Sequence, residues 1–342
     1  VAAGRPYGLG RGEIQPVLGG AWTSAAEAFE LGLRWGDPVG RFDLLALGAV
    51  SNSATDGASV AVAFRRHPTT WGARIYSTTE RPSKAEDAPV GVAALDLDRT
   101  GFELFAERRW QGLLGLGLRG WARLEEIQLE EIDRARDSFS RNVFGVAASF
   151  RSPRTRGALA FRPEAELWAE RGASDGNAFS RGGGQLGLGL GWRKIGDLTL
   201  GWRRDAARDV TLPLDLLRTG GALGSLLPDD PANLSVPALP EGALSGSDRE
   251  TQRIELALDA NGLLGLPIFW ERHRVRAGED EAFDDWLSLA GVEWRRRFEA
   301  IPILRLPAFD ARLGVAKILD TPVSLHALDG DLRGWVVLVW RP

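Results

Sequence analysis

The sequence predicts an all-β fold, a closed antiparallel transmembrane β-barrel of about 16 strands (about 14–18). Apolar residues alternate with polar residues or glycine in runs of about ten residues, which is the period of a β-strand. These runs recur over most of the 342 residues, with turn residues between them. Tryptophan lies preferentially at the ends of the runs, where membrane barrels carry aromatic girdles.

The segment 185–205, QLGLGLGWRKIGDLTLGWRRD, has the clearest pattern. From Leu186 to Trp192, leucine or tryptophan alternates with glycine, and the alternation resumes after a polar break at 194–197. Three glycines at alternate positions would cost a helix about 1 kcal/mol each. The segment is therefore predicted to be a β-hairpin with one apolar and one polar face.

Composition narrows the classes of protein that fit. The formal net charge is −4, so the chain carries no polybasic signal for nucleic acid. No stretch approaches the roughly 18 consecutive apolar residues of a transmembrane helix. Because the chain has no cysteine, disulfides and thiolate metal sites are excluded.

The strands are predicted in order along the chain from the same alternation. Residues 1–13 are expected to form an N-terminal lead-in and 14–342 the barrel. The predicted runs are 14–23, 27–50 with a turn at 36–40, 58–77 with a turn at 66–70, 101–110, 142–151, 165–172, 185–205, 253–259, 285–298, 309–319 and 332–341. The segment 122–137 remains open, as either a long strand running into a loop or a short amphipathic helix.

The connections alternate between short and long, as in outer-membrane barrels with short periplasmic turns and long outer loops. The short ones are predicted at 36–40, 66–70, 98–101, 152–157, 194–197 and 261–266. The long ones are predicted at 80–88, 133–141, 172–183, 210–248, 277–284 and 320–330. Since a C-terminus in the periplasm puts the last three of these outside, lengths and parity agree over the C-terminal half.

Lipid is the expected solvent of the apolar faces. A soluble sandwich of this length would usually divide into two units, and a β-propeller should have a repeat of about 40–50 residues; neither feature is found. No sheet edge can remain open in a bilayer, so the first strand, near 14–23, is predicted to pair with the last.

A resemblance to a known family supports this fold. The stretch 33–77 contains a D-P-x-G-R turn, formed by Asp37, Pro38, Gly40 and Arg41, and a hairpin that turns at Pro68. It resembles the first hairpins of bacterial outer-membrane barrels of the surface-antigen and assembly-factor class. The resemblance implies a barrel that often follows an N-terminal TolB-like β-propeller. Because the chain starts at Val1 without a signal peptide, we expect a processed chain or the C-terminal part of a longer one.

Charged residues on the polar faces are predicted to line the lumen. They serve either as a selectivity lining for a charged solute or as a ladder of cross-strand ion pairs. The lumen-lining candidates are Arg34, Arg65, Arg74, Glu103, Glu107, Arg193, Arg203, Glu255, Glu293, Arg295 and Arg297. The aromatic residues predicted at the membrane interfaces are Trp35, Trp71, Trp110, Trp192, Trp202, Trp294 and Trp340.

Two further features have alternative interpretations. The glycine stripe of Gly187, Gly189, Gly191 and Gly201 either leaves room for an inserted loop or relieves curvature in the sheet. The loop 210–248 is too apolar to be fully solvated. It either folds into the barrel mouth and narrows it, or caps the outer rim or contacts a partner.

The sequence predicts no catalytic site. The three histidines, His67, His273 and His326, have no serine or aspartate at a spacing typical of a hydrolase. His273 is placed within reach of Asp280 or Asp284. We expect no catalytic residues, no cofactor and no metal site.

The expected function is therefore that of a membrane-embedded translocation, assembly or anchoring domain of a bacterial envelope protein. The alternatives are a porin-like passive diffusion channel for small solutes and, third, a barrel-embedded hydrolase. The expected partners are outer-membrane lipid and either other envelope proteins or a periplasmic domain of the same gene product, with no nucleic acid.

Overall fold

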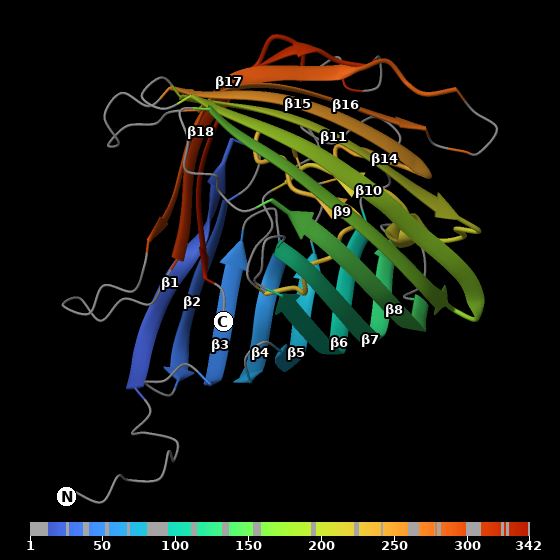
Figure 1. Cartoon of the computed structure of the whole chain (residues 1–342). Coiled ribbons are helices and arrows are strands. Elements are labelled where there is room, and N and C mark those ends of the chain that lie inside the picture. Colours follow the sequence, from blue (N-terminus) through green and yellow to red (C-terminus); the bar gives the residue numbers. More distant parts are fainter. Residues whose placement is uncertain are drawn as a thin grey trace, which may run out of the picture.

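The chain forms a closed barrel of sixteen antiparallel strands in a computed structural model (Figure 1). The structure describes residues 13–24, 27–36, 41–51, 55–66, 69–80, 95–110, 115–131, 137–152, 159–192, 196–221, 226–240, 242–258, 267–276, 278, 282–298, 309–322, 325 and 328–340. Going round the wall, the strand order is β1-β19-β18-β17-β16-β15-β11-β10-β9-β8-β7-β6-β5-β4-β3-β2. The predicted fold class is confirmed.

The wall strands follow one another in sequence order, and the longest connection between consecutive wall strands, residues 209–247, lies between β11 and β15. Their bounds are β1 Glu13–Thr23, β2 Glu27–Gly36, β3 Phe42–Ser51, β4 Thr55–Arg66, β5 Thr69–Glu80, β6 Leu95–Trp110, β7 Gly115–Glu131, β8 Asp137–Arg151, β9 Leu159–Ser174, β10 Asn177–Trp192, β11 Gly196–Arg208, β15 Asp248–Leu258, β16 Pro267–Arg276, β17 Leu287–Phe298, β18 Phe309–Asp320 and β19 Leu332–Trp340.

The first and last strands close the barrel, as predicted. β1 pairs with β19 from Gly20, opposite Leu338, to Thr23, opposite Trp335. Beyond the paired strands, the Ser24 amide donates to the Gly334 carbonyl at 3.0 Å. Closure leaves the paired backbone groups of both strands satisfied, which a bilayer requires.

The start of β1 and the end of β19 lie at one end of the barrel, which we call the terminal end; the opposite end is the loop end. Hairpins at the terminal end include β10–β11, and the long β11–β15 connection lies at the loop end. The motif residues Asp37, Pro38, Gly40 and Pro68 lie outside the described residues.

Three predicted connections need correction, and one of them is 133–141, of which residues 137–141 belong to β8. The predicted short connection 98–101 lies inside β6, because the alternation continues through it with Arg99 buried on the inner face. The predicted long connection 172–183 is a tight turn at Asp175 and Gly176, both at positive φ (50° and 77°), between β9 and β10. Of the two alternatives for 122–137, the long strand is observed as far as the structure describes the segment, because β7 continues to Glu131.

The two faces of the wall have opposite character. Leu31 and Leu33 of β2 are each 54% exposed, whereas the neighbouring Glu30 is 2% exposed. The same contrast holds in β6, where Leu104 is exposed and Glu103 is buried. The leucine-bearing faces therefore lie on the outside of the barrel, as predicted, and the charged faces lie on the inside. An exterior of exposed leucine, valine and phenylalanine is stable in lipid rather than in water.

Among the residues that the structure describes, no helix has the length and hydropathy needed to cross a bilayer.

Candidate functional site

The segment 209–247, between β11 and β15, has structure of its own, and we call it the plug. It contains the 3-10 helix η1 (Pro213–Asp215) and three short strands, β12 (Leu217–Thr219), β13 (Asn233–Leu234) and β14 (Leu244–Gly246). These strands form a small sheet in the order β13-β12-β14. Figure 1 shows this segment in yellow within the ring of wall strands.

Apolar plug residues pack against opposite sides of the wall. Leu226 clusters with Val17 of β1 and with Leu45 and Leu47 of β3. Leu214 clusters with residues of β6 and β7, and Leu217 with residues of β9 and β11. Leu239 lies in the largest cluster, against β16 to β19. A segment that contacts the wall on all these sides crosses the lumen, so of the interpretations open for this loop the structure supports the inward one.

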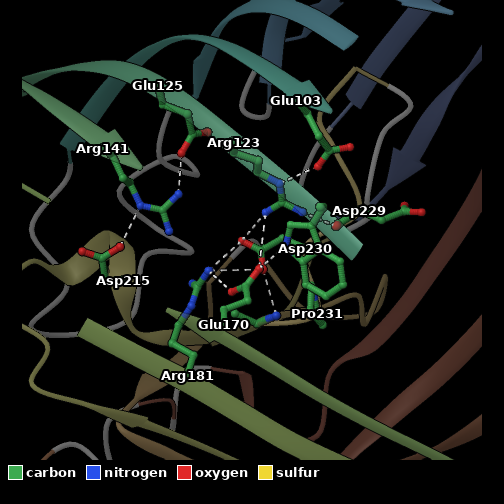
Figure 2. A network of polar contacts seen from close by, with 12 residues as sticks. Glu103, Arg123, Glu125, Arg141, Glu170, Arg181, Asp215, Asp229, Asp230 and Pro231 are labelled. Carbon is green, nitrogen blue, oxygen red and sulfur yellow. Dashed lines mark hydrogen bonds and ion pairs between the residues drawn. The ribbon is translucent and has the colours of Figure 1, made fainter. Parts of the chain in front are cut away.

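Buried ion pairs hold the plug in place, and Arg123 of β7 lies at their centre (Figure 2). Its Nε donates to Glu103 at 2.6 Å, and its Nη2 donates to the carbonyl of the plug residue Asp229 at 2.5 Å. Its Nη1 lies 3.6 Å from the carboxylate of Asp230. Arg123 thus joins the wall to the plug while only 2% of its side chain is exposed.

Asp230 is the plug carboxylate that this network surrounds. Arg181 of β10 lies 3.4 Å from it and also pairs with Glu170 of β9. The backbone N–H of Ala232 donates to the Asp230 carboxylate at 2.9 Å. Burial opposes ionisation of Asp230, but Arg181 and Arg123 outweigh it and lower the pKa of this plug residue below its ordinary value.

A second anchor lies on the β7–β8 side of the wall. Arg141 of β8 donates to Asp215 of η1 at 2.8 Å and also bonds to Glu125 of β7. Tyr76 of β5 donates its hydroxyl to the same Glu125 at 2.6 Å. All four side chains are buried, so η1 is fixed to the wall by charge-assisted bonds.

A third anchor holds β12 of the plug sheet and the residue that precedes β13. Arg249 of β15 donates to Asp205 of β11 at 2.6 and 2.9 Å, and to the carbonyls of the plug residues Arg218 and Ala232. Trp168 donates to the same Asp205 at 2.8 Å. A buried charge is costly unless its bonds are satisfied, and here one guanidinium serves both a carboxylate and plug carbonyls.

The terminal half of the lumen, which we call the vestibule, has a wetter lining. Arg34 donates to Asp43 at 2.7 Å, and Arg65 donates to the same carboxylate at 3.2 Å. Their side chains are 26% and 33% exposed. The vestibule therefore contains cross-strand ion pairs of the kind that a stiffening ladder would have.

The other lumen-lining candidates divide between vestibule and plug. Glu293 accepts from Arg312 at 2.7 Å, Glu255 pairs with Arg295 at 3.5 Å, and Glu107 pairs with Arg109. Arg74 and Arg203 donate to the carbonyls of the plug residues Leu227 and Pro231. Arg193 lies outside the described residues, and Arg297 is described only as part of β17.

Interface tryptophans are exposed at the terminal end of the barrel. Trp35, Trp71, Trp110 and Trp192 lie within two residues of a strand end there, and each is at least 39% exposed. Trp340 is the last residue of β19, and its side chain is outside the description.

Trp202 and Trp294 differ from the expectation that tryptophan marks strand ends. Trp202 lies in the middle of β11, because this strand continues to Arg208 with Asp205 and Ala207 on its inner face. Trp294 is half-buried and lies several residues inside β17.

The glycine stripe makes room for neighbouring side chains. A Cβ at Gly187 would overlap Glu164, and one at Gly191 would overlap Asp197. Gly183, on the same face of β10, abuts Asp205 in the same way. The space is thus taken up by wall side chains rather than by the plug.

His273 is buried among different partners from those predicted. Its Nδ1 lies 3.2 Å from the Thr251 hydroxyl, and its Nε2 lies 3.5 Å from Glu271. The predicted neighbour Asp284 instead donates its backbone N–H to Val275. Asp280, His67 and His326 lie outside the described residues, among which no group of three or more metal-ligating side chains is found.

Sequence reasoning missed the residues that anchor the plug. Arg123 lies in the segment of ambiguous register, and Arg181 lies in a stretch predicted to be a loop. Strict alternation continued from Leu116 along β7 and from Leu186 along β10 would have placed both on the inner face. Asp230 has no local signal, because its partners come from strands about 50 or more residues away in sequence.

Comparison with known proteins shows the fold. No protein-family model and no curated protein matches the chain. Among solved structures, CdiB from Acinetobacter baumannii is similar over 95% of this chain and 59% of that one, with 13% identity and a TM-score of 0.62. BamA from Haemophilus ducreyi lacking POTRA domains 1–3 is similar over 96% of this chain and 70% of that one, with 11% identity and a TM-score of 0.64.

A weaker likeness links the chain to Pseudomonas aeruginosa OccK10 (OpdN), with 12% identity, a TM-score of 0.45 and coverage of 96% of this chain and 98% of that one. The present chain spans about three fifths of the CdiB chain. The closed antiparallel wall and its apolar exterior make this a β-barrel of the bacterial outer membrane.

Proposed function

We propose that this barrel is the membrane-embedded domain of an envelope protein for translocation, assembly or anchoring, and that its own plug keeps it closed at rest. The observation that carries the proposal is the plug, which crosses the lumen and is anchored to several sides of the wall. A passive diffusion channel needs a continuous aqueous path, and a lumen filled by packed leucines does not supply one.

The distribution of polarity supports a closed resting state. Plug residues such as Leu217 and Leu239 are fully buried, so the loop half of the lumen is dry. In the vestibule, by contrast, Arg109 and Arg151 have side chains that are 73% and 80% exposed. The charged chamber is therefore accessible from the terminal end, which would be the periplasmic end of an outer-membrane barrel.

The porin-like alternative has one observation in its favour. The vestibule is lined by charges of both signs that remain partly exposed, as a channel lining would be. It would require that the plug leave a continuous path or move aside, and the two functions differ in the resting conductance that they predict.

Conductance in planar bilayers tests the proposal. We expect the purified chain to give no steady conductance, and a variant in which residues 211–246 are replaced by a short glycine-serine linker to give large, stable openings. The control replaces residues 52–54, which connect β3 and β4, by the same glycine-serine linker. This variant should stay closed.

A steady ohmic conductance of the unmodified chain would favour the diffusion channel instead. If the plug-deleted variant folds, shown by its heat-dependent mobility on a gel, and still stays closed, then the plug is not the closing element.

Two finer points remain part of the proposal. The resemblance of the Asp37–Arg41 turn implies a TolB-like propeller in the same gene product, which the coding sequence upstream of Val1 would reveal. The chain is proposed not to be an enzyme; hydrolase activity of the purified barrel that is lost on His273→Ala would contradict this.

A further inference from the structure

Five arginines gather on the outer, lipid-facing side of the wall near the loop end. Arg204 and Arg208 lie on β11, and Arg272, Arg274 and Arg276 lie on β16. They share this face with exposed Trp202 of β11 and with Ile268 of β16, and they alternate with inward residues such as Asp205 and His273. An arginine on the outer face at mid-bilayer would cost about 2–4 kcal/mol, and much less near an interface.

Strand pairing gives the depth of this cluster. One row of directly paired outward residues climbs round half of the wall from the terminal end of β6 to the loop end of β18. The row is Trp110, Leu116, Phe150, Ala165, Leu186, Trp202, Gln252, Arg272, Ser288 and Asp320. It is apolar from Trp110 to Trp202, with the small residue Ala165 among larger ones, and polar from Gln252 onward.

The tilt of the strands gives the height of each residue of this row along the barrel axis. With strands about 4.8 Å apart and tilted by about 40°, each step to the next strand raises the row by about 3 Å. Arg272 is seven steps from Trp110, so it lies about 21 Å above the terminal-end tryptophan. Because the apolar band of an outer-membrane barrel is about 25 Å tall, Arg272 lies near its outer edge, and Arg274 and Arg276 lie beyond it.

The cluster has more positive charge than its own carboxylates neutralise. Arg274 pairs with Glu250 at 2.6 Å, and Arg276 and Arg208 share Asp248 at 2.5 and 3.2 Å. Asp284 and Asp285 flank the Phe283 and Trp286 rings that contact this cluster, so four described carboxylates face five arginines and leave an excess of one positive charge. Among the described residues, Arg204 forms no ion pair, and Arg272 donates to the neutral Gln252 at 2.7 Å.

Aromatic rings hold the arginines in place. The Arg272 guanidinium lies 4.2 Å from the Trp286 ring and 5.4 Å from the Trp270 ring. Arg274 lies 4.5 Å from both Trp286 and Phe283. Guanidinium groups ordered in this way lose little entropy when they bind an anion.

We propose that this surface, which we call the arginine–tryptophan patch, binds the phosphorylated glucosamine headgroup of lipid A in the outer leaflet. Arg204 and Arg272 form no ion pair among the described residues, and these two guanidinium groups match the two phosphates of that headgroup. The tryptophans supply apolar faces for the sugar rings. The patch thus anchors the barrel in the bilayer at one defined side of the wall, next to the strands that flank the plug.

Lipid A binding to the barrel in neutral detergent tests the proposal. The chain is refolded without lipid A, and a fluorescent diphosphoryl lipid A is titrated in. We expect the variant R204Q/R272Q to bind at least tenfold more weakly, and each single variant to bind more weakly than the unmodified chain. The matched control, R109Q/R151Q, removes the same charge from the terminal rim and should bind as tightly as the unmodified chain.

Competitors identify the ligand. Unlabelled diphosphoryl lipid A should displace the probe, dephosphorylated lipid A should be at least tenfold weaker, and millimolar inorganic phosphate should not displace it. The proposal is overturned if R204Q/R272Q binds like the control variant, if dephosphorylated lipid A competes equally well, or if inorganic phosphate competes as a free ligand.

Discussion

Arg249 is the residue whose loss should loosen the plug most directly, because one fully buried guanidinium bonds a wall carboxylate and three plug carbonyls. Removing one partner of a buried ion pair leaves the other charge uncompensated and costs about 3–5 kcal/mol. We expect Arg249→Met to lower the free energy of unfolding by about 3 kcal/mol, since Arg203 still bonds to Asp205.

Urea unfolding in lipid vesicles, followed by tryptophan fluorescence, measures this effect. Arg295→Met serves as the control, because Arg295 also forms ion pairs but its side chain is 39% exposed. It should cost less than about 1 kcal/mol. Equal losses for the two variants would mean that the Arg249 anchor does not depend on burial.

Because the plug anchor uses the ionised carboxylate of Asp230, the stability of the closed state should depend on pH. Its pKa with the plug in place is lower than its ordinary value of 3.8, so its contribution is complete above pH 3.8 and is lost as the pH falls below that value. We expect the unmodified barrel to stay closed in planar bilayers from pH 7 to pH 5 and to open at more acidic pH. Asp230→Asn should raise the open probability already at pH 7; opening of the unmodified barrel between pH 7 and pH 5 would contradict the assignment.

For single residues, the sequence predicts which side of the wall a side chain lies on better than it predicts which residue that side chain bonds to. Alternation predicts that Glu103 lies on a strand and points inward, but it leaves Arg123 in the segment 122–137, which is open between a strand and a helix. The bond of Arg123 to Asp229 joins the wall to the plug and links residues 106 apart in sequence. Such a pairing depends on how a loop folds, and no short-range pattern encodes it.

At the scale of elements, the apolar alternation correctly predicted the strands, whereas polar segments were assigned to loops too readily. The stretch 172–183 is rich in glycine, serine and asparagine, which are typical of turns. In the barrel its residues continue β9 and β10, because the inner face of a membrane strand is polar and Arg181 can be buried against Glu170. The apolar composition of 210–248 was the informative signal, since it implied that the loop is covered.

The pairing of β1 with β19 gives a prediction at this scale. Ala21 and Val337 are direct partners on the inner face, both buried, and the chain has no cysteine of its own. Because directly opposed residues lie within disulfide range, A21C/V337C should oxidise almost completely in the folded barrel. The linked barrel should keep its compact mobility after heating, as judged on a non-reducing gel.

The control pair shifts one cysteine along the same strand. In V17C/V337C the two positions are four residues out of register, about 13 Å apart, so no disulfide should form. Efficient cross-linking of this pair and failure of A21C/V337C would mean that the barrel closes in another register.

At the scale of the whole molecule, the decisive property is that the leucine-bearing surface lies in hydrocarbon, and depth along one strand tests it. Leu104 and Thr100 are both exposed on the outer face of β6.

The height of these two residues follows from the strand geometry. At about 2.5 Å of height per residue in a strand tilted by about 40°, Leu104 lies about 15 Å above Trp110 and Thr100 about 25 Å above it. Arginine is costly at the middle of the apolar band and nearly neutral at its edge, so we expect Leu104→Arg to destabilise the barrel by about 2–4 kcal/mol and Thr100→Arg by about 0–1 kcal/mol. The measurement is urea unfolding in vesicles of defined thickness, repeated in a thinner bilayer, where the difference between the two variants should shrink. If both substitutions are neutral in every bilayer, the outer surface of this barrel faces water and the membrane assignment is wrong.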